Sequence, residues 1–355
     1  MSGNNDIIAT VTSIGLRYPC LLNVDTSIGD VRIQSLKLIN FDDVYRRIKS
    51  LGSGGYGSVD LYEDRTASQG KLVAIKRIKI NAKKTSLIKS SIVEIDALRS
   101  LTFNGIKNVS QYYTSFLIDT RTGMEMCIVM EYIQGPTLNS FINKLYNAKR
   151  VVDPDFAVRF SIWLFDTIAM IHQEGWVHRD IKPENIIVDE ENNVMKLVDF
   201  GISCTVDLKD EEACNLKDTS GTLQLRPPER YYKDRQSDWF AEFNPNDPHV
   251  LDLFKKADIW IAGITIYYLL HTVFPWTSND QKIIQQQTLD PNFQIAYRYS
   301  VSSPQLIALR DVIDNCLSMN PLDRLDADQL SLKLKLAMLD TLRQREARSP
   351  PQPIR

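Results

Sequence analysis

The chain has 355 residues, of which 43% are hydrophobic and 24% are charged, and its formal net charge is −2 at pH 7. This composition is typical of a globular protein with about two domains, and it excludes a chain that is disordered throughout. The nearly balanced charge provides no basic excess for a nucleic acid or an anionic membrane, so neither is expected as a partner.

Five cysteines are scattered along the chain without a C-x-x-C pair. This pattern argues against a disulfide framework or a zinc site and favours a reducing compartment. We therefore expect an intracellular protein of the cytoplasm, the nucleus or both. Cys204 and Cys214 are expected to be two unrelated thiols, with a redox pair as the alternative. The N-terminal residues lack the basic and then apolar order of a signal peptide.

Strand patterns come first along the chain. Residues 45–79 show a strand, a glycine-rich turn, a strand, a loop and a strand in succession. Apolar residues at three- and four-residue steps then predict a helix over residues 87–101, with Glu94 on its apolar side. A carboxylate in that position needs a partner, because burying it unpaired is costly. Two more strands are expected at residues 112–118 and 126–132.

From residue 155 onward the chain is expected to be mainly helical. One apolar face over residues 156–171 predicts a helix that Gly175 would end. The most apolar run, residues 259–270, is shorter than the ~20 residues of a membrane span and predicts a buried helix. The change from strands to helices near Gly135 predicts a small β-rich lobe followed by a larger helical lobe.

Both ends of the chain differ from its middle. Residues 1–44 are mixed, and alternation at residues 7–11 and 31–33 is compatible with extra strands. Residues 344–355 are rich in arginine and proline and are expected to be disordered.

The first candidate site is a glycine-rich turn. Gly52, Gly54 and Gly57 have the spacing G-x-G-x-x-G, which lets a backbone approach phosphate groups closely. A strand follows this turn, whereas a dinucleotide-binding fold would need a helix there. The Walker A pattern also fails, because Ser58 stands where that motif needs lysine. A plain hairpin turn is the alternative.

The second candidate is Lys76, which lies inside the apolar run of residues 73–76. An ammonium group in such a strand needs anionic partners, because its burial is otherwise costly. The phosphates of a nucleotide and Glu94 would supply them. A lysine that extends its charge to solvent at a strand edge is the alternative.

The remaining candidates are two short polar motifs. Residues 178–185 read H-R-D-I-K-P-E-N and residues 199–201 read D-F-G. Two short apolar stretches between them are expected to be strands that bring Asn185 near Asp199. Oxygen ligands from these residue types suit Mg²⁺, and Asp180 is then left to accept a hydroxyl proton. Each motif alone would fit an ordinary loop, but their order and spacing together are highly specific.

Taken together, these motifs resemble those of eukaryotic-type serine/threonine protein kinases over residues 45–336. The resemblance implies an α+β bilobal fold. A small antiparallel β-rich lobe with one key helix would span about 45–133, and a mainly α-helical lobe would span about 134–336. Residues 231–256 exceed a typical family member and are expected to be an insertion, and residues 337–355 form a helix end and a basic, proline-rich tail.

The resemblance continues beyond the catalytic motifs. Gly221 and Thr222, with residues 227–229, resemble the end of an activation segment, although proline replaces the usual alanine at position 227. Asp258 resembles the residue that holds the backbone of the catalytic loop. Arg324 resembles the buried partner of Glu229, in a pair that is costly to break on one side.

By this resemblance the chain is an ATP-dependent kinase that transfers the γ-phosphate to Ser or Thr hydroxyls of protein substrates, with Mg²⁺ or Mn²⁺. Asp180 would act as the catalytic base and Lys182 would neutralise the transferring phosphoryl group. Asn185 and Asp199 would hold the metal, and Lys76 would contact the α- and β-phosphates. The residues expected to bind the nucleotide are Gly52, Ser53, Gly54, Gly55, Tyr56, Gly57, Val59, Ala74, Lys76, Glu94, Met130, Glu131, Ile133, Ile187 and Asp199.

Specificity follows from fewer residues. Lys182 and the Gly221–Thr222 pair favour serine and threonine over tyrosine as acceptors. Thr137 and Tyr268 stand where family members that prefer arginine upstream of the target carry acidic residues, whereas Glu184 is retained, so a strong preference for upstream arginine is not expected here. The alternative function is a pseudokinase or scaffold that binds nucleotide or partners without turnover. Such proteins commonly lack the catalytic and metal-binding residues that this chain retains.

Regulation remains a hypothesis at this level. Phosphorylation at Thr205, Thr219 or Ser220 could order the activation segment through Arg179. The alternative is that the acidic residues between 207 and 212 make the segment self-sufficient or simply solvated. A regulatory partner could dock on the insertion, but a loop that folds back on its own lobe is the plainer interpretation of that segment. Residues 1–44, an N-terminal extension, could pack on and brace the small lobe, inhibit in cis, or bind a partner.

Overall fold

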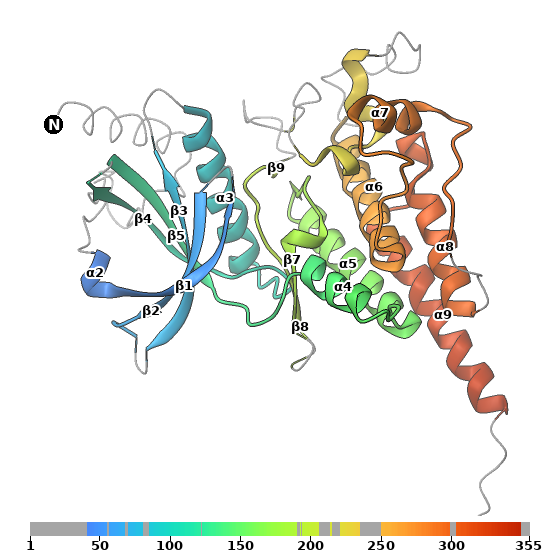
Figure 1. Ribbon diagram of the computed structural model, residues 1–355, viewed down its shortest axis with the longest axis horizontal. Helices are drawn as coiled ribbons and strands as arrows, with labels where there is room; N and C mark the ends of the chain where they lie inside the picture. Colours follow the sequence, from blue (N-terminus) through green and yellow to red (C-terminus); the bar gives the residue numbers. More distant parts are fainter. Residues whose placement is uncertain are drawn as a thin grey trace, which may run out of the picture. The chain divides into compact units, whose positions relative to one another are not determined.

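The computed structural model describes residues 41–54, 57–67, 70–80, 85–121, 123–189, 192, 194–205, 214, 221–234, 250–298 and 303–348. The chain forms two compact units (Figure 1). The first contains the described residues up to Gly135 together with Lys196–Ser203. The second contains Pro136–Met195 and the described residues from Cys204 onward. The alternating segments 7–11 and 31–33 and most of the expected insertion lie outside the described residues.

The first unit is built on a five-stranded antiparallel sheet in the order β1-β2-β3-β5-β4. The strands are β1 (Tyr45–Gly54), β2 (Gly57–Asp64), β3 (Lys71–Lys79), β4 (Tyr112–Thr120) and β5 (Gly123–Glu131). Alternate aromatic and β-branched side chains bury one face of this sheet, as expected for a half-buried pleated surface. The buried cluster comprises Tyr45, Tyr62, Val73, Ile75, Phe116, Ile118, Cys127 and Val129.

Two helices complete the described part of the first unit. The short α2 (Phe41–Val44) precedes β1 and packs Phe41 edge-on against Tyr62, with ring centroids 5.3 Å apart. The long α3 (Thr85–Phe103) confirms the helix predicted over residues 87–101. Its buried side carries Ile88, Ile92 and Ile95, and Glu94 lies among these apolar residues at 2% exposure. The helix therefore places a carboxylate in the interior of the unit.

The second unit is mainly helical, as predicted. Its α-helices are α4 (Leu138–Asn147), α5 (Pro154–Gln173), α6 (Val250–His271), α7 (Gln281–Leu289), α8 (Pro304–Cys316) and α9 (Ala327–Arg348). Asp153 caps α5 by accepting from Asp155 N, and Pro154 occupies its first turn, where a missing N–H costs nothing. Helix α6 packs against α5 and α8, and α5 also packs against α9. The apolar run 259–270 lies in α6 and is buried, which confirms that prediction.

Short elements carry the polar motifs. The strands are β6 (Trp176–Val177), β7 (Ile186–Asp189), β8 (Val194–Leu197) and β9 (Cys204–Thr205), and β6 pairs with β9 antiparallel. Strand β8 leads the chain from the second unit back into the first. The 3₁₀ turns are Pro183–Asn185, Leu223–Leu225, Pro228–Asp234 and Pro321–Asp323. No helix within the described ranges is long and apolar enough to cross a membrane.

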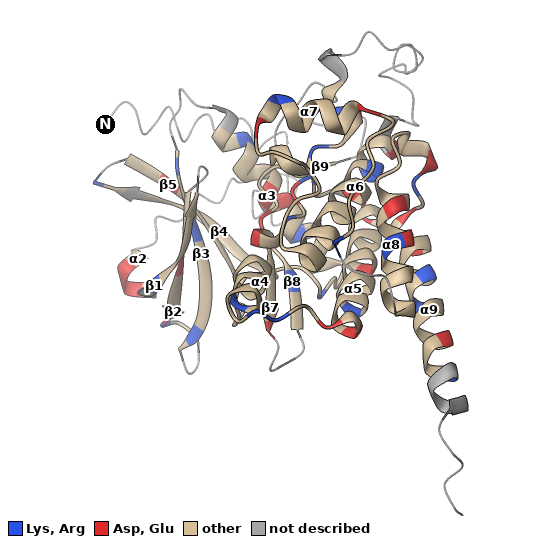
Figure 2. Ribbon diagram, turned by 45° about the vertical axis from the view of Figure 1, so that its right-hand side comes forward, with Lys and Arg blue, Asp and Glu red and all other residues tan. Residues whose placement is uncertain are grey.

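Helix α9 corrects one prediction. It runs to Arg348, so the expected disorder from residue 344 is wrong for residues 344–348, and residues 349–355 lie outside the described part. The physical reason is that arginine, glutamine, glutamate and alanine are good helix formers, and the first proline of the tail is Pro350. Figure 2 shows residues of both charge signs along α8 and α9, a pattern that suits solvent-facing helix surfaces.

Candidate functional site

A buried lysine joins two carboxylates in the first unit. Lys76 Nζ donates to both carboxylate oxygens of Glu94 at 2.7 Å and to Oδ1 of Asp199 at 2.8 Å. Strand β3 carries Lys76 inward and α3 presents Glu94 from its buried side, so their side chains are only 8% and 3% exposed. The Asp199 side chain is 39% exposed. The contact expected between Lys76 and Glu94 is therefore present, and Asp199 joins it.

The charge state of this cluster follows from burial and from the two carboxylates. Desolvation by itself would lower the pKa of Lys76, but attraction by Glu94 and Asp199 outweighs it and raises that pKa above the ordinary lysine value. Burial raises the pKa of Glu94, and the charge of Lys76 opposes this effect. Because one ammonium serves two carboxylates, Lys76 stays protonated at neutral pH and presents a fixed positive charge.

The segment that carries Asp199 is held against α3. Ser90 Oγ donates to the carbonyl oxygen of Gly201. Asp199 itself has φ 66°, in the left-handed region that costs a non-glycine residue free energy and that often marks functional sites. No pattern in the sequence marks Ser90, because a serine on a helix surface has many ordinary explanations. In the structure, Ser90 holds the backbone of the D-F-G turn through its hydrogen bond to Gly201.

The glycine-rich turn lies at the ends of β1 and β2. Their register pairs Gly52 with Val59, Ser53 with Ser58 and Gly54 with Gly57. A Cβ at Gly52 or Gly54 would meet no heavy atom within 4 Å, so these glycines border open space that a phosphate group could enter. Gly55 and Tyr56 lie outside the described residues.

The sheet also aligns apolar residues expected around a nucleotide base. The β2–β3 register sets Val59 opposite Lys76, and the β3–β5 register sets Ala74 opposite Met130. Ala74, Met130 and Ile133 are all buried. Ile187 belongs instead to β7 in the second unit, where it forms an isolated bridge with Thr137.

Glu131 has structural contacts that the sequence does not predict. Its Oε2 accepts from Lys196 Nζ at 2.8 Å and from the backbone N–H of Gln111 at 3.2 Å. Its own N–H donates to the carbonyl oxygen of Gln111 at 2.8 Å. These bonds occupy the side chain and the N–H of Glu131. A nucleotide base could therefore form hydrogen bonds here only with other backbone groups.

The second unit gathers three polar side chains around Asp180. Lys182 Nζ lies 2.5 Å from Oδ2 of Asp180, and Asn185 Nδ2 donates to the same oxygen at 3.0 Å. Thr222 Oγ1 donates to Oδ1 of Asp180 at 2.9 Å. Lys182 Nζ also reaches Thr222 Oγ1 at 3.4 Å. Asp180, Lys182 and Asn185 belong to one short sequence motif, whereas Thr222 comes from a distant segment of the chain.

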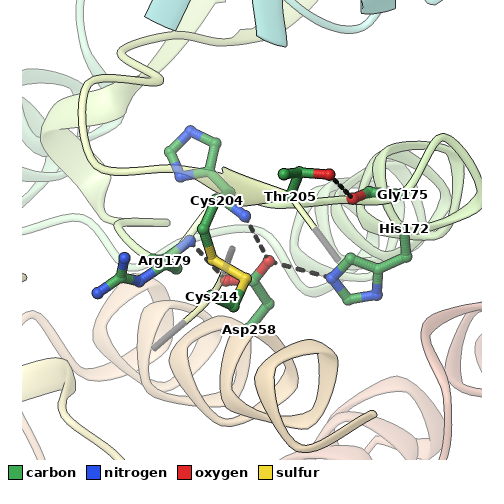
Figure 3. Close-up of a disulfide and its surroundings, with 8 residues drawn as sticks. His172, Gly175, Arg179, Cys204, Thr205, Cys214 and Asp258 are labelled. Atoms are coloured by element: carbon green, nitrogen blue, oxygen red, sulfur yellow. Dashed lines mark hydrogen bonds and ion pairs between the residues drawn. A yellow bond between two sulfur atoms is a disulfide. The ribbon is translucent and has the colours of Figure 1, made fainter. Parts of the chain in front are cut away.

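Asp258 fixes the backbone that presents Asp180 (Figure 3). Its carboxylate is fully buried in α6 and accepts from the N–H groups of His178 at 2.8 Å and Arg179 at 2.7 Å. His172 Nε2 lies 3.0 Å from Oδ2 of the same carboxylate. Arg179 has φ 73°, a strained backbone conformation that these bonds help to hold. The structural role predicted for Asp258 is confirmed.

Cys204 and Cys214 are not separate thiols. Cys204 and Cys214 form a disulfide with Cα atoms 5.0 Å apart (Figure 3), which overturns the prediction of unrelated thiols. The pairing was hidden from sequence because it depends on β9, only two residues long, which places Cys204 beside β6. Cys214 N then donates to the carbonyl oxygen of Thr205 at 3.1 Å and brings the second sulfur to the first.

Other predicted positions fall in several places. Thr205 lies in β9, where its Oγ1 donates to the carbonyl oxygen of Gly175 at 3.5 Å. Thr219 and Ser220 lie outside the described residues. Thr137 caps α4 by accepting from Ser140 N at 3.2 Å, and Tyr268 OH donates to Oδ1 of Asn139 at 3.3 Å. Neither of these last two positions carries an acidic group.

The chain is similar to known proteins over most of its length. The model of the protein kinase domain matches residues 45–333. Serine/threonine-protein kinase pim-2 of Danio rerio is 30% identical over 325 residues, which cover 86% of this chain and 91% of that protein. Serine/threonine-protein kinase Nek2 of Mus musculus is 28% identical over 293 residues, covering 81% of this chain and 58% of the relative.

A further relative, sperm motility kinase Z of Mus musculus, is 28% identical over 271 residues, covering 76% of this chain and 46% of the relative. This chain therefore spans about half the length of the two mouse relatives, although it spans most of the zebrafish protein.

Proposed function

The chain belongs to the protein kinase family, and on that premise we propose that it transfers the γ-phosphate of ATP to serine and threonine hydroxyls of protein substrates. The observation that carries this proposal is the cluster around Asp180, in which one carboxylate contacts Lys182, Asn185 and Thr222 together. A structural loop has no need to hold a lysine, an amide and a hydroxyl on one carboxylate that is 10% exposed.

In this proposal Asp180 is the general base. The substrate hydroxyl oxygen forms the new bond to the γ-phosphorus, the bond to the leaving ADP breaks, and the hydroxyl proton passes to Asp180. Lys182 and Thr222 hold the carboxylate from both oxygens, so its orientation is set before substrate binds. The ammonium of Lys182 would also lie close to the charge of the transferring phosphoryl group and stabilise it.

Asn185 and Asp199 are the proposed ligands of Mg²⁺, which would neutralise phosphate charge during transfer. The amide nitrogen of Asn185 donates to Asp180, so its oxygen is the atom left for a cation. Among the described residues no group of three or more His, Cys, Asp or Glu side chains is placed to hold a metal by itself. The ion would therefore take most of its ligands from water and nucleotide phosphate, as Mg²⁺ usually does.

Lys76 is the proposed partner of the α- and β-phosphates. Its charge is fixed by Glu94, which accepts two bonds of 2.7 Å from the ammonium. The open space beside Gly52 and Gly54 fits a loop that approaches phosphate groups with its backbone. Val59, Ala74 and Met130 would then pack against the adenine.

For the substrate, we propose a protein with a Ser or Thr acceptor and no strong preference for upstream arginine. Thr137 is used as a helix cap and Tyr268 contacts Asn139, so neither offers the carboxylate that an arginine would need. The competing function is a scaffold with the same fold and no turnover. The intact cluster around Asp180 favours the active enzyme.

The test is transfer of labelled γ-phosphate by the purified chain in the presence of Mg²⁺, with acidic and basic protein substrates. Hydrolysis of the products would identify the phosphorylated residue, and Asp180→Asn would serve as the control. Phosphoserine or phosphothreonine that disappears in the control is the expected result. ATP binding without transfer in either protein would favour the scaffold instead.

A further inference from the structure

The Cys204–Cys214 disulfide lies against the strand that leads into the proposed catalytic base. Cys204 is opposite Val177 in the β6–β9 pairing, and His178 follows Val177 directly. Cys204, Val177 and Phe254 are 3%, 0% and 1% exposed and form one buried cluster, against which Cys214 packs. The disulfide, the Cys214 N–H bond to Thr205 and this cluster thus hold two separate stretches of chain on β6.

What β6 supports is the backbone of Asp180. The N–H groups of His178 and Arg179 are bound to Asp258 on one side, at 2.8 and 2.7 Å. The preceding residue, Val177, belongs to the buried cluster that contains Cys204. A change at the disulfide therefore acts three residues before the base, next to the two residues whose N–H groups are bound to Asp258.

The other described cysteines do not compete for this chemistry. Cys127 and Cys316 are both fully buried, and burial raises the pKa of each thiol to about 12. They are therefore neutral and shielded, whereas reaction at sulfur requires a thiolate and access. Cys214 is only partly buried, so its sulfur is the more accessible end of the disulfide.

We propose that Cys204 and Cys214 form a thiol–disulfide exchange site for a low-molecular-weight thiol of the glutathione class, and that the oxidised state sustains phosphotransfer by keeping β9 and Cys214 seated on β6. The expected effect on the transfer rate rests on the proposed function. The thiol–disulfide exchange, and the packing of β9 and Cys214 against β6, do not depend on it. Reduction leaves the cluster of Val177 and Phe254 intact, so the expected loss of rate is partial.

The exchange balances in two steps. A glutathione thiolate attacks the sulfur of Cys214, the sulfur–sulfur bond breaks, and Cys204 leaves as a thiolate that takes a proton. A second glutathione thiolate then attacks the mixed disulfide, giving the Cys214 thiol and oxidised glutathione. The protein gains two electrons and two protons from two glutathione molecules, and the reverse reaction with oxidised glutathione restores the bond.

The experiment equilibrates the full chain in glutathione buffers from reduced to oxidised and measures three quantities in each. Acid quenching, alkylation and peptide mapping report the 204–214 bond. Amide hydrogen exchange reports protection of Trp176 and Val177. Initial rates report transfer of γ-phosphate. The variants are Cys214→Ser, which cannot form the bond, and Cys316→Ala as the matched control that retains it.

We expect reduction to lower the protection of β6 and to lower the transfer rate by about tenfold, in step with loss of the bond. Cys316→Ala should respond as the unmodified chain does, and Cys214→Ser should stay at the reduced rate in every buffer. Failure of the bond to form in oxidised glutathione, an unchanged rate after its reduction, or a higher rate after reduction would each overturn the inference. Absence of transfer in every buffer, with the bond and the protection still coupled, would overturn the proposed function and leave the exchange site supported.

Discussion

Arg324 and Glu229 lie 95 residues apart in the sequence and form two N–H···O bonds of 2.7 and 2.9 Å in the second unit. Their side chains are 0% and 1% exposed. The guanidinium also donates to the carbonyl oxygens of Ser318 and Lys256, both at 2.9 Å. The buried pair predicted from sequence is thus confirmed, and it ties the 3₁₀ turn Pro228–Asp234 to the turn before α9.

Because each charge is fully desolvated, removing one partner should cost much more than an exposed pair is worth. We expect Glu229→Gln to lower the free energy of unfolding by about 3–5 kcal/mol, measured by urea unfolding. The matched control is Arg310→Gln, which breaks a half-exposed pair with Asp314 at 3.7 Å and should change stability little. Equal effects of the two variants would contradict the argument.

Thr222 provides a finer test of the site around Asp180. Thr222→Val removes the bond of 2.9 Å to Oδ1 while keeping the side-chain volume, so Asp180 loses one of its three side-chain contacts and the only one of them to Oδ1. A hydrogen bond to a charged group is worth about 1.5–3 kcal/mol, so the rate of transfer should fall by about tenfold to a hundredfold. Thr222→Ser keeps the hydroxyl and should restore most of the rate. A serine variant as slow as the valine variant would show that retaining the hydroxyl does not restore the rate, and would contradict the argument.

Local motifs made much of this site predictable. Asp180, Lys182 and Asn185 lie within six residues of one another, so chain connectivity alone brings them together. The Lys76–Glu94 contact could be predicted because both charged residues stand among apolar residues and each needs a partner. The disulfide was not predictable, because two cysteines ten residues apart carry no signature and the β6–β9 pairing has no periodicity to detect. Thr222 and Ser90 were missed as contacts for the same reason: each reaches its partner only through tertiary packing.

His271 should make stability depend on pH. It is 5% exposed in α6 and stacks on Tyr267, with ring centroids 4.2 Å apart. Burial, reinforced by Arg298, lowers the pKa of His271 from 6.5 to about 4. Between these values the unfolded chain binds a proton that the folded chain does not, so stability falls as pH drops from 6.5 towards 4. The full loss would be about 3 kcal/mol.

The measurement is urea unfolding at a series of pH values between 7.5 and 4.5 for the unmodified chain and for His271→Phe, which keeps an aromatic ring beside Tyr267. Carboxylates will contribute to the acid slope in both proteins, so the difference between the two curves isolates His271. That difference should grow in favour of the variant as the pH falls through about 6.5. Parallel curves would show that the imidazole does not titrate differently in the two states.

Two glycines of the same turn should respond in opposite ways to one substitution. Gly57 has φ 146°, and a Cβ there would approach the carbonyl oxygen of Arg77 to less than 3.0 Å. Gly57→Ala should therefore destabilise the first unit by about 1–3 kcal/mol, since backbone must move to admit the methyl group. A Cβ at Gly54 meets nothing within 4 Å, so Gly54→Ala should leave the free energy of unfolding unchanged or raise it slightly.

For Gly54→Ala the expected effect lies in nucleotide binding instead. If the turn approaches the phosphates with its backbone, a methyl group at Gly54 enters the space that a phosphate would use, and KM for ATP should rise while stability is preserved. Thermal unfolding and steady-state kinetics on both variants separate the two effects. A Gly54→Ala protein with normal stability and unchanged KM would show that this glycine does not border the phosphates, and the role proposed for the turn would then rest on Gly52 alone.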